Sequence, residues 1–238
     1  MTSTAVDTAS HAPNDASTQE PLSQELKSHT AAAHMAAEDS AFVADLMGGK
    51  LDAAALASLL AQTLVIYRAM EDALALHADD AQLGGFIDPK LARVSALEAD
   101  LAFHYGADWD EQLADGRIAI VPATTAYAQK LAEVGPTSIE FLLAHHYVRY
   151  MGDLSGGLII SRMVQRHYEI AEAGLNFYVF DEIPKPKPYK DAYRDRLDST
   201  NFTREQKDAI LGFAAESFEL NRAVFVDLAA ERASAHAA

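Results

Sequence analysis

Apolar residues recur along most of this chain at the three- and four-residue intervals of an α-helix, and no segment shows a convincing strand-like alternation. Polar residues that favour helix starts precede several of these apolar segments. Asp52 precedes one that extends to about residue 78, Ser23 precedes the first, and Asp88 with Pro89 has the sequence of a helix cap and first turn. The pattern therefore predicts an all-α fold.

Two further helix starts have the spacing of a capping box, in which a threonine is followed three residues later by a glutamate or glutamine. They are Thr137 with Glu140 and Thr203 with Gln206. Residues 139–169, after the first of them, are apolar nearly all the way round the expected helix. This predicts a long helix that is buried on most of its sides.

Both ends of the chain and one internal segment lack the helical pattern. Residues 1–20 are small and polar and predict a disordered N-terminal tail, and 233–238 predict a short disordered C-terminal tail. The segment 183–190, IPKPKPYK, is expected to be an extended connection because prolines interrupt a helix. A single helical domain over 21–232 remains, and 238 residues that are 50% hydrophobic suit one core.

Composition narrows the classes of function. A formal net charge of −16 and a pI near 4.8 disfavour nucleic acids and anionic membrane surfaces as partners. The chain has no cysteine, so a metal would need histidine or carboxylate ligands. We expect no membrane span and no secretory signal, and hence a cytoplasmic protein.

Three glycines, Gly152, Gly156 and Gly157, interrupt the long buried segment. Each costs a helix roughly 1 kcal/mol relative to alanine, so some other interaction should offset them. Gly152 and Gly156 share a helix face, where bare backbone would let a flat ligand lie against the chain, and the adjacent glycines allow a kink. Close crossing of two helices would use the same residues, so both interpretations stay open.

An acidic residue beside the glycines favours the ligand. Asp153 lies in a segment otherwise suited to burial, where a carboxylate needs hydrogen bonds, water or a counter-charge, and such groups cluster at functional sites. Arg149, one turn earlier, belongs either to that site or to a structural salt bridge with Asp153.

A candidate metal ligand lies on the first predicted helix. His34 follows three alanines, so its ring stands on a cleared surface, and Glu38 shares that face and could orient the ring. The acidic chain also contains cationic residues that could bind the carboxylates of an anionic ligand, although their spacing equally fits a solvated surface. These candidates are Lys27, Lys190 and Arg194, together with Tyr147.

With these features together, the chain resembles the haem oxygenases. RYMGDLSGG at 149–157, with a tyrosine shortly before it, is similar to the family's distal-helix signature, and LKSHTAAAHMAAE at 26–38 resembles its proximal helix. The likeness runs from about residue 21 to 230. It implies a single all-helical domain in which haem lies between the first helix and the kinked, glycine-rich helix.

The resemblance also implies a role for each candidate residue. His34 would be the iron ligand and Glu38 its hydrogen-bond partner, while Asp153 would hold water on the opposite side of the haem. The resemblance further assigns Tyr67, Arg149 and Asn221 to the catalytic network around Asp153; Gly152, Gly156 and Gly157 to the haem face; Lys27, Tyr147, Lys190 and Arg194 to the propionates; and Phe218 to packing nearby.

The activity implied by the family is the oxidative opening of haem to biliverdin, carbon monoxide and ferrous iron, with haem as substrate and cofactor and O2 as co-substrate. The sequence has no nucleotide or flavin motif, so the electrons are expected from a separate ferredoxin, flavodoxin or NAD(P)H-dependent reductase. The chain ends without the apolar anchor of membrane-bound members, which favours the soluble bacterial-type branch, and we expect a monomer. Leu158 follows the paired glycines where a polar residue such as glutamine is expected.

Two other functions fit parts of the same pattern. A haem-storage or haem-transfer bundle would bind the same ligand and leave the ring closed, but Asp153 beside the glycines favours the enzyme. A non-haem di-iron site in a helical bundle uses paired Glu-x-x-His motifs, and no glutamate in this sequence is followed by a histidine three residues later.

Overall fold

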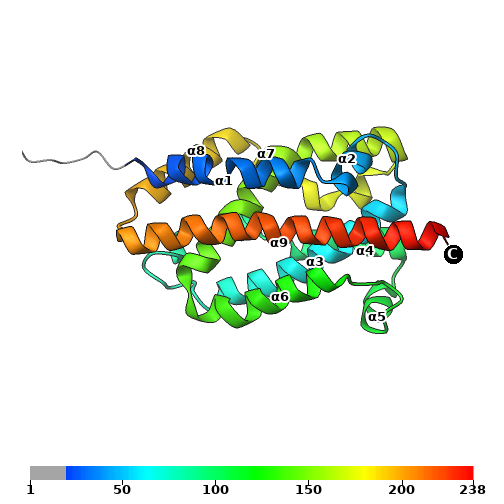
Figure 1. The fold of residues 1–238 in the computed structure, drawn as a ribbon, viewed down its shortest axis with the longest axis horizontal. Coiled ribbons are helices and arrows are strands. Elements are labelled where there is room, and N and C mark those ends of the chain that lie inside the picture. Colours follow the sequence, from blue (N-terminus) through cyan, green and yellow to red (C-terminus); the bar gives the residue numbers. More distant parts are fainter. Residues whose placement is uncertain (1–19, 238) are drawn as a thin grey trace, which may run out of the picture.

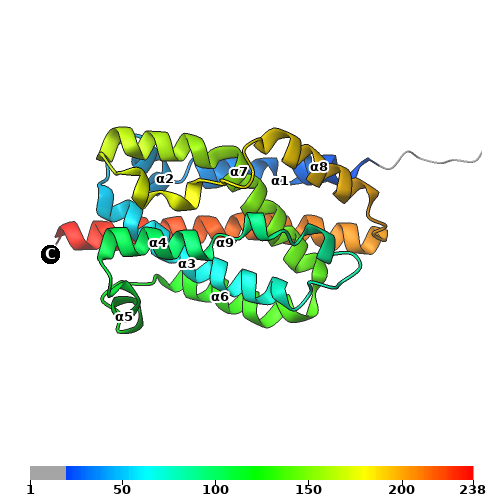
Figure 2. The same cartoon turned by 180° about the vertical axis from the view of Figure 1, so that it is seen from behind.

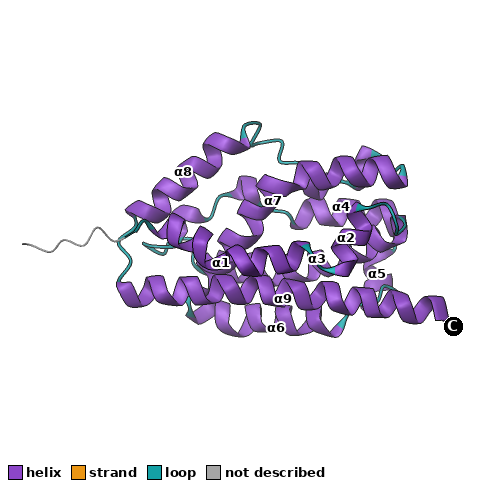
Figure 3. Cartoon of the chain, turned by 45° about the horizontal axis from the view of Figure 1, so that its top comes forward, coloured by secondary structure: helices purple, strands orange, loops and turns teal. Residues whose placement is uncertain are grey.

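The computed structural model describes residues 20–237, with side chains up to Ser234, and their regular structure is entirely helical (Figure 3), which confirms the all-α expectation. The α-helices of this part of the chain are α1 (Leu22–Glu38), α2 (Ala41–Met47), α3 (Ala53–Ala75), α4 (Val94–Tyr105), α5 (Trp109–Ala114), α6 (Pro122–Val134), α7 (Ile139–Tyr168), α8 (Pro186–Ser199) and α9 (Arg204–Ala237). Short 3-10 turns connect them: η1 (Gly84–Phe86), η2 (Pro89–Leu91), η3 (Gly135–Thr137), η4 (Glu172–Gly174) and η5 (Asn176–Tyr178).

Helix α9 runs the length of the molecule and packs against α1, α7 and α6 (Figure 1). Helices α3 and α6 lie on one side of it, and α1 and α8 lie on the other. The long helix α7 starts near α6 and ends on the side of α1 and α8, because it changes direction about halfway along its length (Figures 1 and 2). This bend, expected from the glycines, carries α7 across to the site described below.

Polar caps fix several helix starts as the sequence predicts. Asp52 accepts a hydrogen bond from the backbone N–H of Ala55 at the start of α3. Thr203 and Gln206 exchange side-chain to backbone hydrogen bonds at the start of α9, so the capping box expected there is confirmed. The box expected at Thr137 is wrong, because Ser138, one residue later, caps α7.

Three other expectations at helix ends need correction. Ser23 lies inside α1 and bonds to Asp198 instead of capping the helix. The segment 183–190 is not extended throughout, because α8 begins at Pro186. Prolines are tolerated there because the first turn of a helix leaves its backbone N–H groups without partners. Asp88 and Pro89 start the short turn η2, and α4 follows only from Val94.

The chain ends also differ from expectation where they are described. Helix α9 continues to Ala237, so residues 233–237 are helical and the predicted disordered tail is wrong for them. Alanine has the highest helix propensity of the amino acids, which favours extension of a helix already anchored by packing. The tail expected over 1–20 lies outside the described residues except for Glu20.

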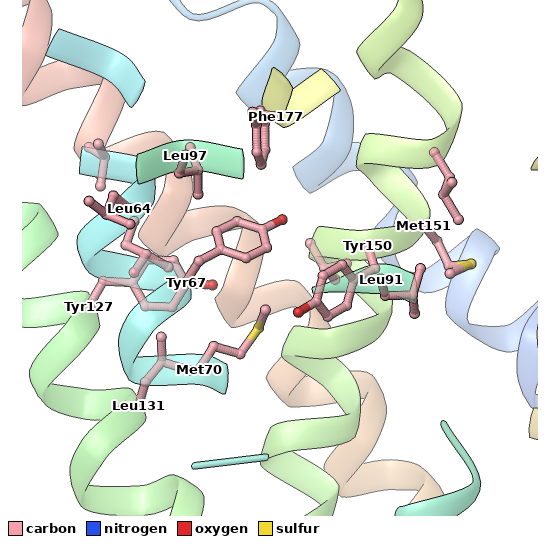
Figure 4. Close-up of a cluster of buried hydrophobic side chains, with 14 of the residues drawn as sticks. Leu64, Tyr67, Met70, Leu91, Leu97, Tyr127, Leu131, Tyr150, Met151 and Phe177 are labelled. Carbon is pink, nitrogen blue, oxygen red and sulfur yellow. The ribbon is translucent and has the colours of Figure 1, made fainter. Parts of the chain in front are cut away.

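Helix α3 supplies much of the core. Within the part of the chain that the structure describes, it alone is long and apolar enough, by length and composition, to cross a membrane. Its most apolar window is 61% buried inside the protein, as is usual for a core helix. Tyr67 and Met70 of α3 are completely buried, with Tyr127 and Leu131 of α6 beside them (Figure 4).

Candidate functional site

His34 stands half exposed on α1. Its side chain is 50% exposed, and its Nδ1 lies 3.4 Å from Oε2 of Glu38, one turn further along the helix. The ring makes an edge-on contact with Phe218 of α9, with centroids 5.3 Å apart. Because Glu38 faces Nδ1, Nε2 is the nitrogen available to a metal.

Gly152 and Gly156 form an open face on α7. A Cβ atom built on either glycine would meet no atom within 4 Å, apart from chain neighbours and the helix's own backbone, so no other helix crosses α7 there. Close helix crossing therefore does not explain these two residues. Gly157 differs, because a Cβ there would lie 3.5 Å from Cδ1 of Tyr178, and this glycine allows η5 to pack closely on α7.

The four residues expected to form the catalytic network are connected. The Tyr67 hydroxyl donates a hydrogen bond to Oδ2 of Asp153. The Arg149 guanidinium lies over the Tyr67 ring, 4.9 Å from its centroid, and its Nη1 donates to Oδ1 of Asn221 at 2.6 Å. In the described structure Arg149 is thus bonded to Asn221 rather than ion-paired directly with Asp153.

Burial and charge set the protonation of this network. Burial raises the pKa of Asp153, and the nearby Arg149 partly opposes the rise. Burial and the Asp153 charge together raise the pKa of Tyr67, so its hydroxyl keeps its proton and remains the donor. Burial alone would lower the pKa of Arg149, but its interactions with Tyr67 and Asp153 more than compensate, and the guanidinium stays charged.

Helix α9 joins the imidazole to the acidic network. Phe218 touches His34, and Asn221, three residues further along α9, bonds to Arg149. Residues three apart in a helix lie on nearly the same face, so α1 and α7 present His34 and Arg149 to one stretch of α9. The structure therefore brings the metal-ligand candidate and the network together.

Lys190 of α8, one of the expected anion-binding residues, lies against α7 beside the glycine face. Lys190 donates from Nζ to Oγ of Ser155 at 2.8 Å, immediately beside Gly156 in the chain. Arg194 pairs with Oδ1 of Asp191 at 2.9 Å. Tyr147 is half-buried, and Lys27 is exposed on α1 two turns before His34. Burial lowers the pKa of Lys190, as expected for a cation without a strong counter-charge.

Sequence patterns did not indicate the side chains that pack against Tyr67 and behind it. Tyr150 and Phe177 each contact the Tyr67 ring with centroids 5.6 Å apart, and all three appear in Figure 4. The Tyr150 hydroxyl donates to Oε1 of Glu71, which also accepts from the backbone N–H of Arg93. Glu71 is an acid four residues after Tyr67 in an apolar helix, and that spacing was the available signal.

This arrangement fits a flat, anionic ligand that brings its own metal. Among the described residues no group of three histidine, cysteine, aspartate or glutamate side chains could hold a metal ion. A metal at His34 would therefore need most of its ligands from elsewhere, as a macrocycle provides. The open glycine face suits the plane of such a ring, and the nearby cations suit its carboxylates.

Comparisons with known proteins agree with this geometry. Residues 20–227 match the family model described as "Heme oxygenase". The chain is 35% identical over 208 residues to "Heme oxygenase" of Rhodella violacea, covering 87% of this chain and 86% of that protein. It is 34% identical over 210 residues to "Heme oxygenase" of Takifugu rubripes, covering 87% and 74%.

A solved structure gives the same fold. The crystal structure of heme oxygenase-1 from the cyanobacterium Synechocystis sp. PCC6803 in complex with heme superposes with a TM-score of 0.85 at 30% sequence identity. The match covers 92% of this chain and 96% of that one.

Proposed function

Since this chain belongs to the haem oxygenase family, we propose that it opens haem in the space between α1 and α7 with the residues described above. The reaction is the oxidative opening of haem to biliverdin, carbon monoxide and iron, and it requires a reductant. When bound, haem supplies the iron centre at which dioxygen is reduced and the porphyrin that is cleaved. The roles of individual residues follow from their positions.

The observation that carries this proposal is the open face at Gly152 and Gly156, together with the packing of His34 and of the Asp153 network against the same stretch of α9. His34 would bind the iron through Nε2, while Glu38 near Nδ1 holds the ring orientation and favours the neutral tautomer with its proton on Nδ1. Without side chains on Gly152 and Gly156, the porphyrin plane can lie directly against the backbone of α7.

Asp153 would hold water beside the bound substrate. Tyr67 donates to one carboxylate oxygen of Asp153 and fixes its orientation, which leaves the other oxygen to accept from water. The Arg149 Nε is buried and has no hydrogen-bond partner among the described residues, so the network has a free donor for water there as well. Water held in this way delivers protons without direct contact between an acidic side chain and the reacting atoms.

The cations would fix the rotation of the substrate about the axis through its iron. Lys190 and Arg194 on α8, with Tyr147 and Lys27, would bind the propionate carboxylates. Binding of the propionates at these residues would give the ring one preferred orientation, and orientation decides which carbon of the porphyrin faces the network.

We also propose the working context of the enzyme. The electron donor would be a separate ferredoxin, flavodoxin or NAD(P)H-dependent reductase, and the enzyme would act as a monomer in the cytoplasm. The strongly acidic composition, with a net charge of −16, supports solubility at high concentration.

The test is a reaction of the purified protein with hemin, dioxygen and a reductant, followed by absorbance and by chromatography of the products. The proposal predicts biliverdin and carbon monoxide in amounts stoichiometric with the haem consumed. A protein that only stores or transfers haem would change the oxidation state of the iron and return intact porphyrin, and that result would refute the proposed function.

A further inference from the structure

A buried tyrosine–histidine pair joins α7 to α8. The Tyr193 hydroxyl and Nδ1 of His146 are hydrogen-bonded at 2.9 Å, and the two rings are nearly parallel, with centroids 5.6 Å apart. His146 is 1% exposed and Tyr193 is 5% exposed. The ring of Phe86 lies 5.0 Å from that of Tyr193, and the His146 ring also hydrogen-bonds to the Phe86 backbone.

This pair has a fixed protonation state. Burial lowers the pKa of His146 to about 3, so the ring is neutral and Nδ1 can accept a hydrogen bond from Tyr193. Burial also raises the pKa of Tyr193 well above its usual value, so its hydroxyl remains a donor. The bond therefore persists across the neutral and mildly acidic range, which suits a structural link and not a titrating one.

The position of the pair relates it to the proposed propionate-binding residues. Tyr193 follows Lys190 by three residues on α8 and directly precedes Arg194. His146 directly precedes Tyr147 on α7. In the described structure, two hydrogen bonds join α7 to α8: the one between Tyr193 and His146, and the one from Lys190 to Ser155. The second involves Lys190, which has to share or give up this bond when it binds a ligand, so the first is the bond between the two helices that does not depend on the ligand.

We propose that His146, acting through Tyr193, is a positioning residue that fixes α8 on α7 so that Lys190 and Arg194 face the carboxylates of bound haem. This inference rests on the proposed function, because it concerns the same ligand. It assigns a role to two buried residues that do not themselves reach the substrate. A pair that only filled the core would affect every porphyrin ligand equally.

Ligands that differ only in their carboxylates separate these two possibilities. Hemin carries two free propionates, whereas hemin dimethyl ester has the same ring and iron without those charges. Tyr193→Phe removes the hydroxyl and keeps the ring. We expect the variant to bind hemin roughly threefold to tenfold more weakly than the wild type, as for loss of one buried hydrogen bond. Its affinity for the dimethyl ester should change less than about twofold.

A control comes from the neighbouring histidine of α7, His145, which also bonds to a buried tyrosine. The Tyr127 hydroxyl bonds to Nδ1 of His145 at 2.8 Å, and both residues are completely buried, but Tyr127 belongs to α6. Tyr127→Phe therefore removes that bond, and also a bond of the same hydroxyl to Oγ of Ser217 on α9, on the side of α7 that faces away from α8. Its affinities for hemin and for the ester should change by the same factor. An equal loss for both ligands in Tyr193→Phe would overturn the positioning role.

A second pair of variants keeps the inference testable if Tyr193→Phe unfolds. His146→Asn places an amide oxygen close to the lost Nδ1 and can accept from Tyr193, whereas His146→Leu cannot. The discrimination between hemin and its ester should be retained by His146→Asn and lost by His146→Leu. Equal discrimination in both would contradict the inference. Failure of the wild type to bind hemin at all would instead refute the proposed function.

Discussion

The Tyr67 hydroxyl donates its hydrogen bond to the Oδ2 carboxylate oxygen of Asp153, across the boundary between α3 and α7. Tyr67 has no exposed surface, and two aromatic rings pack against it. A half-buried carboxylate that accepts from a rigid tyrosine has one orientation. The core of the protein therefore sets the direction in which Asp153 can hold water.

The first prediction concerns this carboxylate. Asp153→Ala removes the acceptor for water and should lower the biliverdin formed per haem consumed by at least about tenfold, within the range for loss of a proton-positioning group. Hemin binding should persist, because His34 and the glycine face are unchanged. A single-turnover assay measures the yield, and a yield equal to that of the wild type would remove Asp153 from the mechanism.

The second prediction concerns stability. Because burial raises the pKa of Asp153, the folded protein holds this proton to a higher pH than the unfolded chain does. The free energy of unfolding therefore falls as pH rises from the pKa of Asp153 in the unfolded chain to its higher pKa in the folded protein. At neutral pH the ionised carboxylate lowers the stability. Asp153→Asn keeps an acceptor for Tyr67 and should be at least as stable as the wild type at pH 7. Urea unfolding tests this, and a clearly less stable variant would contradict it.

The third prediction uses the open glycine face. Gly152 and Gly212 are both exposed helical glycines at which a Cβ would meet no atom within 4 Å. Replacing either with leucine should keep or raise the stability of the protein. Leucine favours a helix over glycine by about 1 kcal/mol. Gly152→Leu should weaken hemin binding at least about tenfold. Gly212→Leu on α9 should bind like the wild type, and similar affinities of both variants would argue against the glycine face.

The fourth prediction concerns acid unfolding. Burial lowers the pKa values of His145 and His146 to about 3, whereas an unfolded histidine titrates near its ordinary value. Their contribution to stability is complete above about pH 6.5 and is lost as pH falls toward about 3. Each histidine adds a slope of about 1.4 kcal/mol per pH unit within that window.

His146→Leu isolates one of these two contributions. As pH falls from about 6 to about 5, where most carboxylates stay ionised, the unfolding free energy of the variant should decrease less steeply than that of the wild type. The difference in slope corresponds to about one proton fewer taken up on unfolding. Denaturant unfolding at several pH values measures both slopes. Identical slopes would mean that His146 also titrates normally in the folded protein.

Sequence patterns predicted the helices with strong local signals. Asp52 and the Thr203 with Gln206 pair marked true helix starts, and the apolar stretch around Tyr150 marked the buried helix α7. The start of α8 was missed because prolines read as helix breakers, although the first turn of a helix accepts them. The end of α9 was missed because its alanines carry little apolar surface.

The site was predicted residue by residue only through its resemblance to a family. Spacing alone left Gly152 and Gly156 open between a ligand face and a helix crossing, and the empty space beside them resolves this. Spacing could not distinguish Gly157 from the other two glycines, because its contact with Tyr178 depends on the fold of a distant turn. The bond between Tyr193 and His146 likewise joins helices far apart in sequence, which no local pattern reports.

The central claim is that a porphyrin lies between the imidazole of His34 and the bare backbone at Gly152 and Gly156. An absorbance titration of the purified protein with hemin, run beside His34→Ala with and without added imidazole, tests it most directly. The claim predicts an equimolar complex with the spectrum of imidazole-ligated ferric haem, its loss in His34→Ala, and its return when imidazole is added. An imidazole-type spectrum that survived in His34→Ala alone, or no equimolar complex with the wild type, would contradict it.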